Sequence, residues 1–110
     1  MAPGPSGLLA LREMTGTTRS SGGLDLRRRK LLYRSWHRGT REMDLIMGRF
    51  ADACLHELTT AELDDYERLI DTPDPDLYAW ISGKRAAPSD YDTALFRKLR
   101  NFQRRAGQER

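Results

Sequence analysis

The chain has 110 residues, of which 38% are hydrophobic and 32% are charged, and its formal net charge is +3 at pH 7. This length favours a single domain with a thin core, and the absence of an apolar run of about 18 residues argues against a membrane-spanning helix. Cys54 is the only cysteine, which excludes an internal disulfide and favours a reducing compartment, so we expect a cytoplasmic protein.

Residues 1–23 precede the first predicted helix and are rich in Gly, Ser, Thr and Pro. This composition predicts a disordered tail, and its apolar run "LLAL" is too short for the core of a secretory signal. The Ser, Thr and Arg content has a weak likeness to a transit peptide, which keeps the mitochondrial matrix open as an alternative location, although Glu13 counts against it. We expect one helical domain over 24–106 and a frayed end at 107–110.

The first predicted helix covers about residues 25–36. Asp25 is a suitable N-cap, because its carboxylate can accept a hydrogen bond from the first free backbone N–H groups. Leu32 and Trp36 lie four residues apart on one face, and Tyr33 lies beside them, so this face is expected to contact the core.

The second predicted helix covers about residues 41–57. Gly48 lies inside it, where glycine is less favourable than alanine by about 1 kcal/mol, so we expect close packing of another helix at this position. The predicted apolar stripe contains Met43, Ile46, Met47, Phe50, Ala53 and Cys54.

The third predicted helix covers about residues 60–71. Thr59 and Glu62 have the spacing of a capping box, in which each side chain accepts a hydrogen bond from the other residue's backbone. One face is acidic, and the opposite face is expected to be buried and carries Leu63, Tyr66, Leu69 and Ile70.

A short fourth helix is predicted over about 75–82. Asp74 is a good N-cap for it, with Pro75 at the first helical position, and Gly83 is expected to end it. Its apolar residues are Leu77, Trp80 and Ile81.

The fifth predicted helix covers about residues 90–105, with Ser89 as its N-cap. Its apolar stripe is predicted to contain Tyr91, Leu95, Leu99 and Phe102. No alternating apolar and polar run competes with these helices. We therefore predict an all-α fold, a compact bundle of about five short helices.

Charge is distributed unevenly along the chain. Residues 1–30 carry a net charge of +4 and residues 94–110 carry +5, whereas residues 51–79 carry −8. Phosphate binding needs a sustained positive surface, so the acidic centre argues against a dedicated nucleic-acid binder. The basic ends keep one alternative open, a small nucleic-acid-binding or antitoxin-like regulatory protein.

Few residues are suited to catalysis or metal binding. Cys54 and His56 are two positions apart and point to different faces of a helix, whereas a zinc site needs about four ligands at characteristic spacing. No glycine-rich phosphate loop is present. We therefore expect no catalytic residue, no metal and no cofactor bound by this chain, and a buried structural role for Cys54.

The segment "HRGTREMD", residues 37–44, gathers charged groups around one glycine between the first two helices. Gly39 can serve as a turn, since glycine tolerates the left-handed backbone, and the charges beside it have local roles at the helix ends. These roles leave unexplained why so many charges meet at one corner. Arginine binds carboxylates and carbonyls through a planar fork, which favours protein recognition. The predicted partner-binding residues are His37, Arg38, Gly39, Arg41, Glu42 and Asp44.

Two segments carry a resemblance to a known family. "HRGTREMDL" contains an RGxxE motif, and "LTTAELDDYERLIDTPDPDLYAWISG" follows it with an acidic Tyr-x-x-Leu-type helix and a "DPDLYxW"-like stretch. In this order and at this length, they resemble the flavinators, the succinate dehydrogenase assembly factors of bacteria and mitochondria. The resemblance covers about residues 25–105.

The resemblance implies a compact all-α bundle that promotes covalent attachment of FAD to the flavoprotein subunit of succinate dehydrogenase, and in bacteria also to that of fumarate reductase. Arg38, Gly39 and Glu42 would bind this partner near its FAD-linking histidine, with Asp44 extending the motif and Trp80 in the second segment. We expect a monomeric assembly chaperone that has no active site of its own and binds no membrane. Because no phosphate cradle is visible, direct binding of FAD by this chain is not predicted. The long N-terminal tail departs from the compact bacterial pattern.

Overall fold

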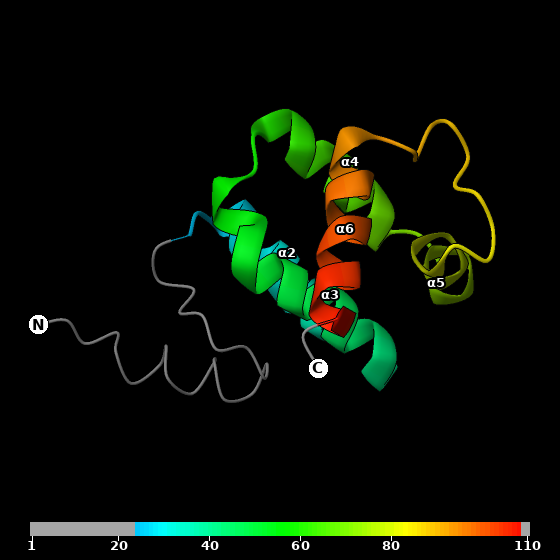
Figure 1. The fold of residues 1–110 in the computed structure, drawn as a ribbon. Coiled ribbons are helices and arrows are strands. Elements are labelled where there is room, and N and C mark those ends of the chain that lie inside the picture. The colour runs from blue at the N-terminus through cyan, green and yellow to red at the C-terminus, as the bar shows by residue number, and fades with distance from the viewer. Residues whose placement is uncertain (1–23, 109–110) are drawn as a thin grey trace, which may run out of the picture. The chain divides into compact units, whose positions relative to one another are not determined.

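The structure, a computed structural model, describes residues 24–108, and in this range it contains helices and no strand (Figure 1). The predicted all-α class is confirmed. The predicted tail over 1–23 and the last two residues lie outside the described range. The helices are α2 (Leu26–Trp36), α3 (Arg41–Cys54), α4 (Thr60–Ile70), α5 (Asp74–Ser82) and α6 (Ala94–Gln108), with a 3-10 turn, η2 (Leu55–Glu57), after α3.

The described helices fall into two units, which we describe separately. The first unit ends at His56 and contains α2 and α3, and the second begins at Glu57 and contains α4, α5 and α6. None of these helices is both long and apolar enough to cross a membrane.

In the first unit, α2 packs against α3. Asp25 caps α2 as predicted, since its carboxylate accepts a hydrogen bond from the N–H of Arg28 at 2.9 Å. Gly48 is buried, and a Cβ atom at this position would overlap the indole ring of Trp36. The predicted close helix packing at Gly48 is therefore confirmed. The buried residues of this helix pair are Leu31, Leu32, Ser35, Met43, Ile46, Met47, Gly48, Phe50 and Ala51.

The end of α3 differs from the prediction. The α-helix stops at Cys54, and its predicted last turn is the tighter turn η2, a common ending because it pairs carbonyls that have no partner in the α-helix. The guanidinium of Arg28, on α2, donates from Nε to the carbonyl oxygen of Leu55 at 2.9 Å. This bond fastens the start of α2 to the end of α3.

In the second unit, α6 packs against both α4 and α5. The predicted capping box at the start of α4 is confirmed, because the Thr59 hydroxyl accepts from the N–H of Glu62 at 3.1 Å and the Glu62 carboxylate accepts from the N–H of Thr59 at 2.9 Å. Lys98 on α6 lies 3.5 Å from the same carboxylate. The apolar residues predicted to be buried on α4 and α5 are all buried.

Two predicted helix starts are wrong. Helix α5 begins at Asp74 itself, with Pro73 as the N-cap residue and no side-chain cap; Pro75 is still tolerated because N–H groups of a first turn lack helical partners. Helix α6 begins at Ala94 instead of about residue 90. The hydroxyl of Thr93 caps it by accepting from the N–H of Phe96 at 3.1 Å, in place of Ser89.

Five side chains lie elsewhere than predicted. Tyr33 is 49% exposed, Ala53 is exposed, Cys54 and Phe102 are half-buried, and Tyr91 precedes α6 in a turn. Phe96, absent from the predicted stripe, is fully buried. In each case the helical periodicity was shifted by a residue or the helix boundary was misplaced.

Candidate functional site

The 37–44 corner, residues 37–44, joins α2 to α3 and contains all six predicted partner-binding residues. Gly39 has φ +110°, and a Cβ atom built on it would meet no atom within 4 Å. The glycine is therefore required by the backbone conformation, which L-residues rarely adopt, and the space beside it is open.

Two hydrogen bonds from the start of α3 fix this corner. The Asp44 carboxylate accepts from the backbone N–H of Arg38 across the bend, and the Thr40 hydroxyl accepts from the N–H of Met43 at 3.3 Å. Asp44 and Glu42 also place negative charge in the first turn of α3, where the helix dipole favours it. Asp44 thus has an internal role that the sequence pattern did not indicate, because its partner is six residues away across a non-helical glycine.

His37 is also engaged locally. Its ring stacks on that of Tyr33, with centroids 4.0 Å apart and an angle of 16° between the planes. Its Nδ1 lies 2.8 Å from the carbonyl oxygen of Tyr33. A carbonyl only accepts hydrogen bonds, so Nδ1 carries the proton. Nε2 of this exposed ring is then left to accept a bond from a partner when the imidazole is neutral.

The other charged groups of the corner are more accessible. Arg41 and Glu42 are exposed, and Arg38 is half-buried. Neither the Arg41 nor the Glu42 side chain has a hydrogen-bond or ion-pair partner among residues 24–108. Gly39 and Asp44 therefore fix the backbone of the corner, and the turn exposes a cation, Arg41, and an anion, Glu42.

The Trp36 indole, one residue before the corner, lies over Gly48 and sets how closely α2 approaches α3. Its Nε1 atom is buried and has no hydrogen-bond partner in the described structure. The packing of this ring and the two hydrogen bonds above hold the corner in place without using its outward charges.

Trp80, from the second segment of the resemblance, belongs to the interior of the second unit. It is 8% exposed, and its ring lies 5.1 Å from that of Tyr91. The guanidinium of Arg68 lies 4.9 Å from the centroid of Tyr91. This position assigns Trp80 to the packing of α5.

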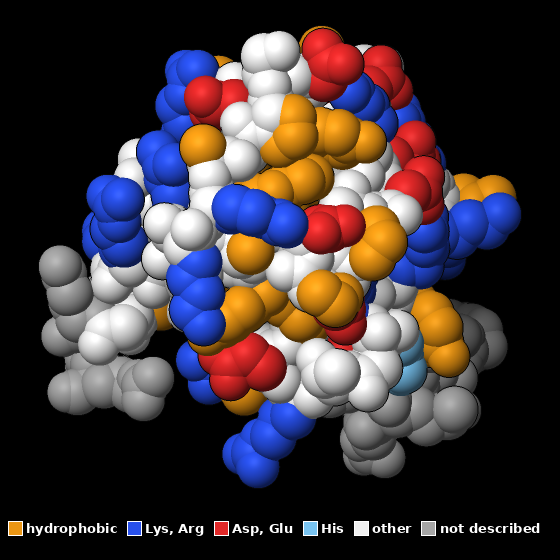
Figure 2. All heavy atoms as spheres, turned by 90° about the vertical axis from the view of Figure 1, so that its right-hand side faces the viewer, with side chains coloured by type: hydrophobic (Ala, Val, Ile, Leu, Met, Phe, Trp, Pro, Cys, Tyr) orange, Lys and Arg blue, Asp and Glu red, His pale blue; other side chains and the backbone are white. Residues whose placement is uncertain are grey.

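The structure assembles no metal-binding cluster in the range 24–108, where no group of three or more His, Cys, Asp or Glu side chains is placed to hold an ion. Cys54 is half-buried, whereas His56 is exposed. On the face of the molecule in Figure 2, acidic, basic and apolar side chains occur together. Such a mixture is ordinary for a folded protein and does not by itself mark a binding surface.

Comparison with known proteins places this corner in a family. Residues 29–103 match the family described as flavinator of succinate dehydrogenase, and the match includes the whole 37–44 corner. The chain belongs to this flavinator family. No solved structure matches the chain significantly.

Three curated relatives illustrate the similarity. The chain is 40% identical over 74 residues to succinate dehydrogenase assembly factor 2, mitochondrial, of Dictyostelium discoideum, covering 67% of this chain and 52% of that protein. It is 38% identical over 76 residues to FAD assembly factor SdhE of Acetobacter pasteurianus, covering 69% and 70%. The factor of Scheffersomyces stipitis is 48% identical over 59 residues, covering 54% and 40%. The matched part thus spans about half the length of the mitochondrial relatives.

Proposed function

We propose that this flavinator-family chain binds the flavoprotein subunit of succinate dehydrogenase and promotes the covalent attachment of FAD to it. The names of the relatives support this role, since they are called succinate dehydrogenase assembly factor 2 or FAD assembly factor. The structural observation that carries the proposal is the exposed Glu42 beside Gly39 on a corner whose backbone is fixed internally. The flavoprotein of fumarate reductase is a second proposed partner.

The chain acts in this proposal as a chaperone without an active site, and FAD is attached to the partner. Covalent linkage requires the flavin and the accepting histidine of the flavoprotein to be aligned, and alignment alone can lower a barrier by several kcal/mol. The chain would favour the aligned conformation by binding it more tightly than the others, because equal affinity for all conformations shifts nothing.

The contacts at the corner follow from its chemistry. Glu42 accepts hydrogen bonds from a basic or N–H-rich surface of the flavoprotein, and Arg38 and Arg41 bind carboxylates or carbonyls. Gly39 lets the partner's backbone approach, since the space beside it is open. We propose that the chain works as a monomer in the cytoplasm, with the mitochondrial matrix as the alternative location.

The experiment measures covalent flavin on the flavoprotein, by its fluorescence after denaturing electrophoresis, in cells that lack the native copy of this gene. Glu42→Ala should lower covalent flavin by at least about tenfold, as expected for loss of a central charged contact, and Gly39→Arg should do the same. Both variants should remain helical by circular dichroism.

Asp76→Ala is the matched control, because it removes an exposed carboxylate of α5 that is paired with Arg85. It should leave flavinylation at the wild-type level. If Glu42→Ala also does so, the site assignment is wrong. If the wild-type chain itself fails to restore flavinylation, the proposed function is wrong. If it instead binds a nucleic acid with an affinity that falls steeply with salt, the antitoxin-like alternative gains support.

A further inference from the structure

One face of α2 is unusual for its exposed apolar side chains. Leu26 and Tyr33 are 59% and 49% exposed, and they are the only large hydrophobic residues that are exposed among residues 24–108. They lie seven positions apart, two turns of helix, and therefore on the same face. We call this surface the α2 outer face, and it consists of Leu26, Arg29, Lys30, Tyr33 and His37.

The cations on α2 differ in what they do. Arg28 is used inside the first unit, where it binds the Leu55 carbonyl oxygen and forms an ion pair with Asp25 at 2.8 Å. Arg29 and Lys30 are exposed, and neither side chain has a hydrogen-bond or ion-pair partner in the described range. The two charges on the outer face are thus available to another molecule.

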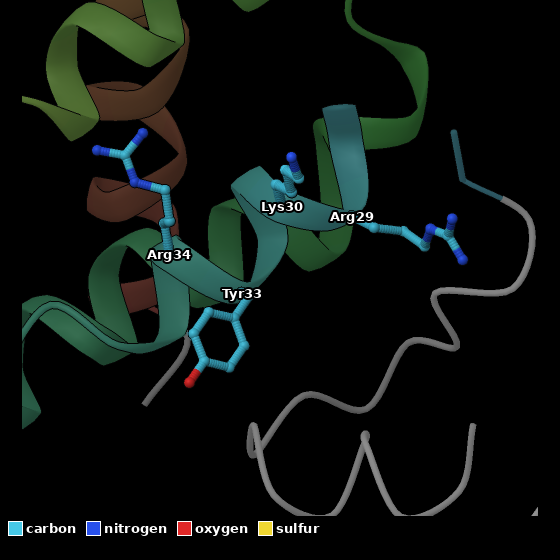
Figure 3. A pocket seen from close by; sticks show the side chains of 4 residues that line it. All are labelled: Arg29, Lys30, Tyr33 and Arg34. Atoms are coloured by element: carbon cyan, nitrogen blue, oxygen red, sulfur yellow. The ribbon is translucent and has the colours of Figure 1, made fainter. Parts of the chain in front are cut away.

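An open depression lies beside the stems of these side chains. Arg29, Lys30, Tyr33 and Arg34 line a depression of about 360 Å³, and Figure 3 shows their side chains extending from α2 in different directions around the helix. The ring of Tyr33 also stacks on His37, which belongs to the 37–44 corner. The outer face is therefore continuous along one helix with the proposed partner-binding corner.

We propose that the α2 outer face binds an acidic segment of the flavoprotein that carries at least one apolar side chain. This inference rests on the proposed function and extends its interface by about two helical turns. Carboxylates of the segment would pair with Arg29 and Lys30, and the apolar side chain would cover Leu26 and Tyr33. Exposed tyrosine and arginine are the residues that most often dominate protein interfaces.

Other ligand classes fit the face less well. A membrane-bound helix needs a wide apolar surface, because its affinity scales with the apolar area it buries, and α2 exposes two large apolar side chains. A single-stranded nucleic acid needs free aromatic faces for base stacking, and one face of the Tyr33 ring already lies against His37.

The test measures the affinity of the full-length chain for the flavoprotein subunit of succinate dehydrogenase from the same source, at low and at physiological salt. The double charge reversal Arg29→Glu with Lys30→Glu should weaken binding by about tenfold and reduce its salt dependence. The control reverses two exposed arginines of α6, Arg104→Glu with Arg105→Glu, which gives the same change in net charge and should weaken binding by less than about threefold.

A second pair of variants tests the apolar contact. Tyr33→Ala should weaken binding by at least about fivefold, as expected for an aromatic interface residue, whereas Tyr33→Phe, which keeps the ring, should bind like the wild type. Because this side chain is exposed, circular dichroism should show no loss of helix in either variant.

The remaining outcomes overturn the inference. If the two double charge reversals weaken binding equally, the outer face is not a docking site, while a flavinylation defect of Glu42→Ala would still support the proposed function. If the wild-type chain does not bind the flavoprotein, both proposals fail. Tighter binding to phosphatidylserine-containing vesicles or to a single-stranded oligonucleotide, lost in the Arg29→Glu, Lys30→Glu variant, would assign the face to that ligand class instead.

Discussion

Two connections between helices in this chain, called links here, contain the same residue types but differ in what those residues contact. The link between α2 and α3 contains Gly39 at φ +110°, and the one between α5 and α6 contains Gly83 at φ +85°, each with open space beside it. Both links have arginine and acidic residues close by. In sequence they look alike, and the structure separates them by the partners of their charges.

Around the second link the two arginines pair with aspartates, while Asp90 is exposed and its side chain has no partner in the described range. Arg85 lies 2.7 Å from Asp76, and Arg97 lies 3.2 Å from Asp92. At the 37–44 corner, one carboxylate binds a backbone N–H within the corner, and Glu42 has no partner in the described part of the chain. Pairs as exposed as those of the second link stabilise weakly. The comparison teaches that an unpaired charge on a rigid turn, more than the residue type, marks a candidate recognition site.

The largest expected effect comes from Gly48, whose contact with Trp36 holds the helices that flank the corner. Gly48→Ala adds a methyl group that overlaps the indole ring, and overpacking of this kind costs about 1–3 kcal/mol, more than the gain in helix propensity of about 1 kcal/mol. We expect a lower free energy of unfolding, measured by denaturant titration.

Gly107→Ala is the control for this substitution. Gly107 also lies in a helix, but a Cβ atom there would meet nothing within 4 Å. This variant should be as stable as the wild type or more stable by up to about 1 kcal/mol. If Gly48→Ala stabilises the protein to the same extent, the Trp36 contact does not limit the approach of α2 to α3.

Substituting the two link glycines tests the comparison directly. Gly39→Ala and Gly83→Ala should each destabilise the chain by about 1–2 kcal/mol, since both force an L-residue into a left-handed backbone. Flavinylation assays at matched amounts of folded protein should show a defect for Gly39→Ala alone. Equal flavinylation by both variants would remove the distinction between the links.

Substitutions of Asp44 distinguish a role in fixing the backbone of the corner from a role in binding the partner. Asp44→Ala removes the acceptor for the Arg38 N–H and should lower the free energy of unfolding by about 1 kcal/mol. Asp44→Asn keeps a neutral acceptor and should lose less stability. Flavinylation should follow the same order, and a strong defect in Asp44→Asn without loss of stability would assign the carboxylate to the partner interface.

The smallest expected effect concerns Glu62, whose carboxylate contacts the N–H of Thr59 and the side chain of Lys98. The hydrogen bond from the N–H of Thr59, and then the charge of Lys98, lower the pKa of the Glu62 carboxyl below its ordinary value. A lowered folded-state pKa stabilises the fold above the unfolded-state pKa, and this contribution disappears as the pH falls through the folded-state pKa.

The measurement compares wild type with Glu62→Gln by denaturant unfolding. The wild type should be more stable by about 0.5 kcal/mol at pH 7. The difference should shrink as the pH falls below the ordinary carboxyl range and vanish once it is below the lowered folded-state pKa. Flavinylation should be unchanged, which would set Glu62 apart from Glu42. A difference in stability that is independent of pH would contradict this account.

The sequence by itself determined the features that depend on neighbours along the chain. Helical periodicity located all five helices, the capping box at Thr59 and Glu62 formed as predicted, and Gly39 and Gly83 lie at the turns where they were expected. These signals act over about four residues, so the local chain contains both partners of each interaction.

Tertiary structure decided which groups those helices bury and which charges they leave unpaired. The local sequence marks Gly48 only as a weak helix former, and the structure shows that Trp36 lies against it. Tyr33 is exposed because α2 packs against α3 through its other face. The sequence analysis predicted Ser89 as the cap of α6, whereas in the structure Thr93 caps this helix. Burial and pairing depend on residues that are distant along the chain, so no local pattern could specify them.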